Sequence, residues 1–174
     1  MMKTIINKVS ILTLCFLAFS LVSNAQINKK KKANKDTENW RYEIECVGIG
    51  KPGTKVVRVW SYSKKATIAQ TQSKKNAVHG LIFQGYAAGG QGCTAQKPLS
   101  NNPAVEQEKE DFFKDFFAEG GKYMKFVSMS GDNVPTVVKV GKEYKVGVVV
   151  VVMTDNLRKD LEAAGVVRGL SSGF

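Results

Sequence analysis

Five consecutive valines at positions 148–152 lie within the apolar segment 143–153, EYKVGVVVVVM. The β-branched side chain of valine is restricted at χ1 and packs well on a pleated surface. An unbroken apolar run of this length is typical of a strand that is buried on both faces. The segment therefore predicts a strand in the middle of a sheet, with helices or other layers covering it.

The remaining apolar patterns predict a single α+β layer structure around this strand. Residues 40–47 alternate between apolar and acidic side chains, and turn chemistry at 51–54 joins them to the β-branched segment 55–62, which predicts a hairpin. Further strands are expected at 81–86, 122–129 and 136–140, and helices at 63–79, 104–119 and 156–164. The predicted order is β-β-α-β-loop-α-β-β-β-α, a single sheet of about six strands with three helices packed on it.

Small residues form one stripe of the first predicted helix. Ser63 is its expected N-cap, and Gly80 is the glycine expected to end it. At 100° per residue the stripe consists of Ala66, Ala69, Ser73 and Ala77. Such a stripe allows a helix to lie close to a sheet.

Phenylalanines dominate the second predicted helix, for which Asn102 is the N-cap before Pro103. Its broad apolar stripe consists of Val105, Phe112, Phe113, Phe116 and Phe117. The simplest interpretation is a contribution to the core, and the alternative is the wall of a ligand pocket.

The N-terminal segment has the layout of a secretory signal peptide. Lysines precede an apolar run at 9–22, and small residues lead to an expected cleavage between Ala25 and Gln26. The alternative is an uncleaved N-terminal anchor. We expect a signal peptide at 1–25, a basic disordered leader at 26–38 and one α+β domain at 39–174. Export to the periplasm or the extracellular space follows, with association with the outer membrane as a variant, and no transmembrane span after cleavage.

Two cysteines, Cys46 and Cys93, remain after the signal peptide is removed. An even pair in an exported protein is a candidate disulfide, and the alternative is that Cys46 is a small buried apolar residue. Cys93 lies in a Gly-, Ser- and Asn-rich segment at 87–102, which predicts a long loop. Long loops in compact domains are often functional, so this loop is the best candidate for a binding surface.

Lysines give the chain a formal net charge of +11. The leader contains Lys29, Lys30, Lys31 and Lys32, and the first predicted helix contains Lys64, Lys65, Lys74 and Lys75. Such groups are usually solvated, but they also form a possible basic surface for lipid head groups or an acidic polymer. Export makes nucleic acid an unexpected partner.

Catalytic and cofactor motifs are scarce. Residues 48–53 match G-x-G-x-x-G, but the following segment is β-rich rather than helical, so a dinucleotide site is not expected. One histidine and two distant cysteines offer no ligand spacing for a metal, and the sequence indicates no cofactor. His79 as a base with Cys93 as a nucleophile is the enzymatic alternative, although a capping or packing role for His79 is favoured.

These observations favour an exported, non-enzymatic binding or assembly module of the bacterial cell envelope. Its partner would be another envelope protein or a second copy. The alternatives are a Cys/His-dependent hydrolase that uses His79 and Cys93, and a binder of anionic polymer or lipid head groups. An oxidised Cys46–Cys93 pair would remove the nucleophile of the hydrolase.

A strand, an alanine-spaced helix, a strand and a late valine-rich strand together resemble a small envelope domain. That domain occurs at the N-terminus of flagellar assembly protein T and in some secreted or lipid-anchored outer-membrane proteins. The likeness covers roughly residues 40–90 and 136–163 and rests on this pattern, including Ala66, Ala69 and Ala77. The chain departs from it in its Phe-rich helix, its long loop and its lack of a lipidation site. The resemblance implies an accessory or assembly role in the cell envelope, and it carries over no catalytic residues to this chain.

Overall fold

The computed structural model describes residues 40–89, 92–131 and 134–169. The predicted signal peptide, its cleavage site at Ala25 and Gln26, the leader at 26–38 and its four lysines lie outside the described residues. So does part of the turn expected at 131–133.

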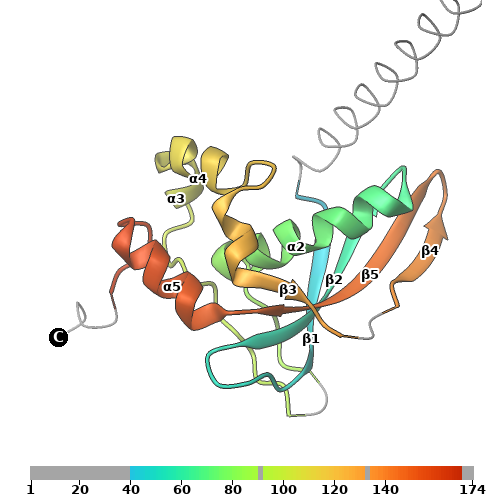
Figure 1. Ribbon diagram of the computed structural model, residues 1–174, viewed down its shortest axis with the longest axis horizontal. Coiled ribbons are helices and arrows are strands. Elements are labelled where there is room, and N and C mark those ends of the chain that lie inside the picture. The colour runs from blue at the N-terminus through green and yellow to red at the C-terminus, as the bar shows by residue number, and fades with distance from the viewer. Residues whose placement is uncertain (1–39, 90–91, 132–133, 170–174) are drawn as a thin grey trace, which may run out of the picture. The chain divides into compact units, whose positions relative to one another are not determined.

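The described residues form an α+β fold with one antiparallel five-stranded sheet (Figure 1), so the predicted fold class is confirmed. The strands are β1 (Tyr42–Gly48), β2 (Lys55–Ser63), β3 (Val127–Met129), β4 (Thr136–Val140) and β5 (Glu143–Val152). The order is β1-β2-β5, and the far edge of β5 is shared by β4 and β3. The predicted hairpin is β1 and β2, and the valine strand β5 is central.

The valine strand is buried fully on one face only. Val146, Val148, Val150 and Val152 are completely buried against the helical layer, whereas Val149 and Val151 are half-buried on the opposite face. Cross-strand ion pairs and aromatic contacts occupy that opposite face, for example Lys145 with Glu43 at 2.8 Å. The expectation of burial on both faces is therefore only partly correct.

The helices are α2 (Ala66–Phe83), α3 (Val105–Glu108), α4 (Glu110–Phe116) and α5 (Thr154–Ala163), with a 3₁₀ helix, η1 (Lys122–Phe126). The three predicted helices therefore correspond to α2, to α3 together with α4, and to α5. The expected helix at 104–119 is interrupted at Lys109, whose ψ of 34° departs from helical geometry. Most of the strand expected at 122–129 is η1, and only its end forms β3.

Gly80 lies inside α2 and does not end it. A Cβ atom at this position would approach Ile44 Cδ1 to 3.1 Å and Tyr42 Cε2 to 3.2 Å, so Gly80 extends the small-residue stripe that lets α2 lie on the sheet. The helix ends at Phe83, and Gly85 (φ +65°), two residues further on, donates its N–H to the Gly80 carbonyl. The predicted strand at 81–86 is therefore wrong, because residues 81–83 belong to α2. The apolar side chains of Leu81 and Ile82 are fully buried, but on a helix rather than on a strand.

One hydrophobic core lies between the sheet and the helices. The small-residue stripe is confirmed as close packing: Ala69, Ser73 and Ala77 are fully buried. The Phe-rich stripe also belongs to this core, with Phe113, Phe116 and Phe117 buried and Phe112 packed against them. Leu157 and Leu161 add the inner side of α5.

Candidate functional site

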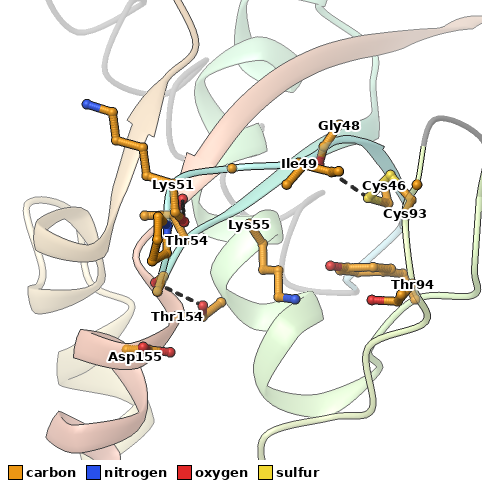
Figure 2. Close-up of a pocket in the computed structure, with 15 residues that line it drawn as sticks. Cys46, Gly48, Ile49, Lys51, Thr54, Lys55, Cys93, Thr94, Thr154 and Asp155 are labelled. Carbon is orange, nitrogen blue, oxygen red and sulfur yellow. Dashed lines mark hydrogen bonds between the residues drawn. A yellow bond between two sulfur atoms is a disulfide. The ribbon is translucent and has the colours of Figure 1, made fainter.

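A pocket of about 330 Å³ lies where the β1–β2 turn, the long loop after α2 and the start of α5 meet (Figure 2). This volume is at the lower end of the range for small-molecule sites. The side chains around it are mostly polar and include Lys51, Thr54, Lys55, Thr94 and Asp155. Cys46 and Cys93 form its wall on the side of the long loop.

The β1–β2 turn is fixed to the N-terminus of α5. The Gly53 carbonyl accepts hydrogen bonds from the Asp155 N–H at 3.2 Å and from the Thr154 hydroxyl at 3.1 Å. Gly53 has a φ of +75°, and a Cβ there would lie 2.9 Å from the Asp155 carboxylate. The glycine therefore serves the turn and its contact with α5. A strand, β2, follows the G-x-G-x-x-G segment, as the sequence predicts.

A disulfide between Cys46 and Cys93 joins the long loop to β1, with Cα atoms 5.9 Å apart. The predicted bond is present in the structure. The base of the loop is closed by reciprocal backbone hydrogen bonds between Tyr86 and Gln96, both 2.9 Å. The covalent and hydrogen-bonded links together hold the loop over the pocket.

Lys55 occupies the centre of this site. Figure 2 shows its side chain extending into the pocket between Thr154 and Thr94, whereas Lys51 points away from it. Lys55 is half-buried, and its ammonium group has no hydrogen-bond or ion-pair partner among the described residues. An ammonium group without an ion-pair partner can donate charge-assisted hydrogen bonds to an anionic group. An anionic ligand would supply the missing partner.

Tyr86 also lines the pocket and is 8% exposed. Burial raises the pKa of its phenol, so the group stays neutral at physiological pH. A neutral phenol and the Thr94 hydroxyl can donate hydrogen bonds without adding negative charge, whereas the Thr54 and Thr154 hydroxyls already donate to the Lys51 and Gly53 carbonyls. The pocket is therefore suited to a polar ligand with at least one anionic group.

His79 lies in a separate buried cluster beneath Trp40. Its Nδ1 lies 2.6 Å from the Tyr42 hydroxyl, its Nε2 lies 3.1 Å from Glu106 Oε1, and its ring stacks on Trp40 with centroids 3.5 Å apart. Burial lowers the pKa of His79, and the hydrogen bond from His79 lowers the pKa of Glu106. One tautomer satisfies every group: Nε2–H donates to the Glu106 carboxylate, and the Tyr42 O–H donates to Nδ1.

The structure does not bring His79 and Cys93 together. His79 is 3% exposed and forms hydrogen bonds with Tyr42 and Glu106. Cys93 forms a disulfide with Cys46 and therefore has no thiol. His79 also lies within α2 rather than at its end, so it packs and does not cap. Burial of the phenylalanines in the main core likewise places them away from the lining of the pocket.

The predicted basic residues of α2 have different surroundings. Lys64 and Lys65 are exposed before the helix, and Lys74 is half-buried. The Lys75 ammonium lies over the Trp40 ring at 5.1 Å from its centroid. Lys75 therefore covers the His79 cluster and is not simply part of an open basic face.

Within the described residues, no group of three or more His, Cys, Asp or Glu side chains is placed to hold a metal ion. In the same part of the chain, no helix combines the length and apolar character needed to cross a bilayer. No protein-family model, curated protein or solved structure matches this chain. The resemblance to the envelope domain of flagellar assembly protein T therefore stays a prediction.

Sequence reasoning identified the loop and its disulfide but missed Lys55, Thr154 and Asp155 as parts of one site. A signal for Lys55 was present, because strict alternation along β2 places Lys55 on the same face as Val57 and Val59, which are fully buried. A lysine in register with core valines is an anomaly that marks a site.

Proposed function

We propose that this protein is an exported, non-enzymatic binding module of the bacterial cell envelope. Its site is the pocket around Lys55, and its ligand is a small molecule that carries a carboxylate or phosphate group. The observation that carries the proposal is that Lys55 is half-buried in the pocket lining and its ammonium group has no protein partner among the described residues. The signal-peptide pattern at 1–25 and the Cys46–Cys93 disulfide support export, because disulfides persist in oxidising compartments.

The construction of the site supports binding of a discrete ligand rather than loose attraction of ions. Three separate segments converge on it, and two of them are fixed by the disulfide and by the Gly53 hydrogen bonds to α5. A preformed pocket reduces the ordering cost of binding. Asp155 at the rim gives the site one acidic group to receive a hydroxyl or amine of the same ligand.

A hydrolase that uses His79 and Cys93 receives less support. Cys93 has no thiolate to attack a substrate while it is bonded to Cys46. His79 is enclosed by aromatic rings, and both of its nitrogens already have partners. Turnover that is lost on replacing His79 or Cys93 would contradict the binding proposal.

The test is isothermal titration calorimetry of the purified protein with a panel of small sugar phosphates and hydroxycarboxylates. We expect at least one compound to bind and Lys55→Met to weaken it about tenfold to a hundredfold, the usual effect of losing a hydrogen bond to a charged group. Lys97→Met is the matched control, because it removes the same charge from an exposed side chain of the long loop that does not line the pocket.

Equal loss in both variants would indicate diffuse electrostatic attraction and would contradict the proposal. Absence of binding by every compound in the panel would also count against it. Binding of an acidic polymer alone, falling steeply with salt and lost on replacing Lys64 and Lys65, would favour the alternative of a polymer binder.

A further inference from the structure

The two edges of the sheet differ in how well they are protected. β1 carries charged side chains at Glu43 and Glu45, Arg41 directly precedes it, and its register shifts between Cys46 and Gly48. Charges and bulges are the usual means by which proteins prevent unwanted pairing at a sheet edge. β4, at the opposite edge, carries one charged side chain, Lys139, and its pairing with β5 has no register shift.

β4 is exposed along its whole length and is rich in valine. The exposed fractions are 52% for Val137, 45% for Val138 and 49% for Val140, and Val134 just before the strand is 84% exposed. Among the described residues, β4 pairs only with the N-terminal half of β5, from Glu143 to Gly147. Alternate residues of a strand turn their N–H and C=O groups outward, and no other described strand pairs with the outer side of β4, which is therefore the side offered to an additional strand.

The charges near this edge are positive. Lys139 lies within β4, Lys142 lies in the turn that follows, and neither has an ion-pair partner among the described residues. The acid of the adjacent strand, Glu143, is bonded to Arg41 at 2.9 Å. A strand that carries a carboxylate opposite Lys139 would complement this edge.

A second copy of β4 fits less well. Antiparallel pairing of two β4 strands would bring four lysines, two from each copy, to one seam between molecules of strongly positive net charge. Like charges that face each other across strands are destabilising. Charge therefore selects a partner that is acidic as well as apolar.

We propose that β4 docks an extended segment of a partner protein, in which valine-like residues alternate with Glu or Asp, as an additional strand of the sheet. Backbone hydrogen bonds would give affinity, contacts with Val138 and Val140 on one face of β4 would give apolar burial, and Lys139 on the other face would select the charge. This surface is distinct from the Lys55 pocket and does not depend on it.

The experiment is an NMR titration of the ¹⁵N-labelled protein with two synthetic seven-residue peptides, one alternating valine with glutamate and one alternating valine with lysine. We expect the glutamate peptide to shift amide signals of residues 136–140 and the lysine peptide to leave them unchanged. A glutamate peptide that is N-methylated at alternate residues should bind at least tenfold more weakly, because it cannot complete the ladder.

Charge reversal sharpens the test. Lys139→Glu should weaken binding of the glutamate peptide roughly threefold to tenfold and create binding of the lysine peptide, consistent with cross-strand charge pairs. Lys125→Glu, in η1, changes the net charge equally away from β4 and should have no effect. Shifts outside β4, equal effects of both variants, or a self-associated protein whose dimer is lost in Val138→Lys would overturn the proposal.

Discussion

The His79 cluster and the Lys55 pocket are two polar sites within one domain, and they differ in whether the protein satisfies them. His79 is enclosed, and Tyr42 and Glu106 supply a partner for each ring nitrogen. Lys55 is only half-buried, and the described residues supply no partner for its ammonium group. The first site is complete without a ligand and the second is not.

This difference separates polar groups that stabilise the fold from polar groups that are available to bind a ligand. Buried polar groups are normally hydrogen-bonded, and a satisfied network makes the native packing specific. The His79 cluster ties β1, α2 and α3 together through Tyr42, His79 and Glu106. An unsatisfied cation in a pocket contributes little to folding and is free to bind. Substitutions should therefore lower stability at the first site and binding at the second.

The largest expected effect on stability comes from the disulfide that forms the wall of the pocket. Replacing both Cys46 and Cys93 by serine should lower the free energy of unfolding by about 4 kcal/mol on the chain-entropy model for a loop of this size. Urea unfolding of the purified variant measures the change. A change below about 1 kcal/mol would show that hydrogen bonds alone hold the loop.

The His79 cluster should give the next largest effect. His79→Phe keeps an aromatic ring next to Trp40 but removes the bonds to Tyr42 and Glu106, and we expect a loss of about 3 kcal/mol because the Tyr42 hydroxyl is left buried without a partner. Tyr42→Phe breaks only one of the two bonds and should cost about 1–2 kcal/mol. Equal stability of wild type and His79→Phe, measured by urea unfolding, would contradict a structural role.

Acidification should also lower the free energy of unfolding through the His79 cluster, but by less than the His79→Phe substitution does. The pKa of His79 is lowered by burial, so below about pH 6.5 the unfolded chain binds a proton that the folded chain does not. The pKa of Glu106 is also lowered, so its contribution is lost as the pH falls through its folded pKa. Both signs predict a free energy of unfolding that falls from pH 7 to pH 4.

The measurement is urea unfolding at a series of pH values for wild type and His79→Phe. The variant lacks the titrating ring, so its curve should be flatter between pH 7 and pH 5. Parallel curves would mean that other groups control the pH dependence.

Much of the fold that surrounds these two sites could be predicted from the sequence. Periodicity predicted the β1–β2 hairpin, the central valine strand and the close-packed stripe of α2, because burial imposes a period on side chains. The cysteine count predicted the disulfide. Gly80 was wrongly predicted to end the helix, because glycine often follows the last helical residue. Here its missing Cβ instead leaves room for the side chains of Ile44 and Tyr42 of β1.

The two polar sites were harder to predict because each joins segments that are distant in the chain. Glu106 reaches His79 from α3, and Asp155 reaches the pocket from α5, more than a hundred residues from Cys46 in the chain. Residue spacing carries no information on such encounters. The register of Lys55 with Val57 and Val59 is the one local sign, and its meaning depends on what the face of β2 packs against.

Lys55→Met should have the smallest effect on stability and therefore gives the sharpest test of the comparison. Lys55 has no partner to lose among the described residues, and methionine keeps the unbranched stem that packs in line with the core valines of β2. We expect the free energy of unfolding without ligand to change by less than about 0.5 kcal/mol. The stabilisation by a bound anion, seen in wild type as a rise in melting temperature, should be lost. If Lys55→Met lowered the free energy of unfolding without ligand by more than about 1 kcal/mol, Lys55 would be, like His79, a residue that the fold itself requires.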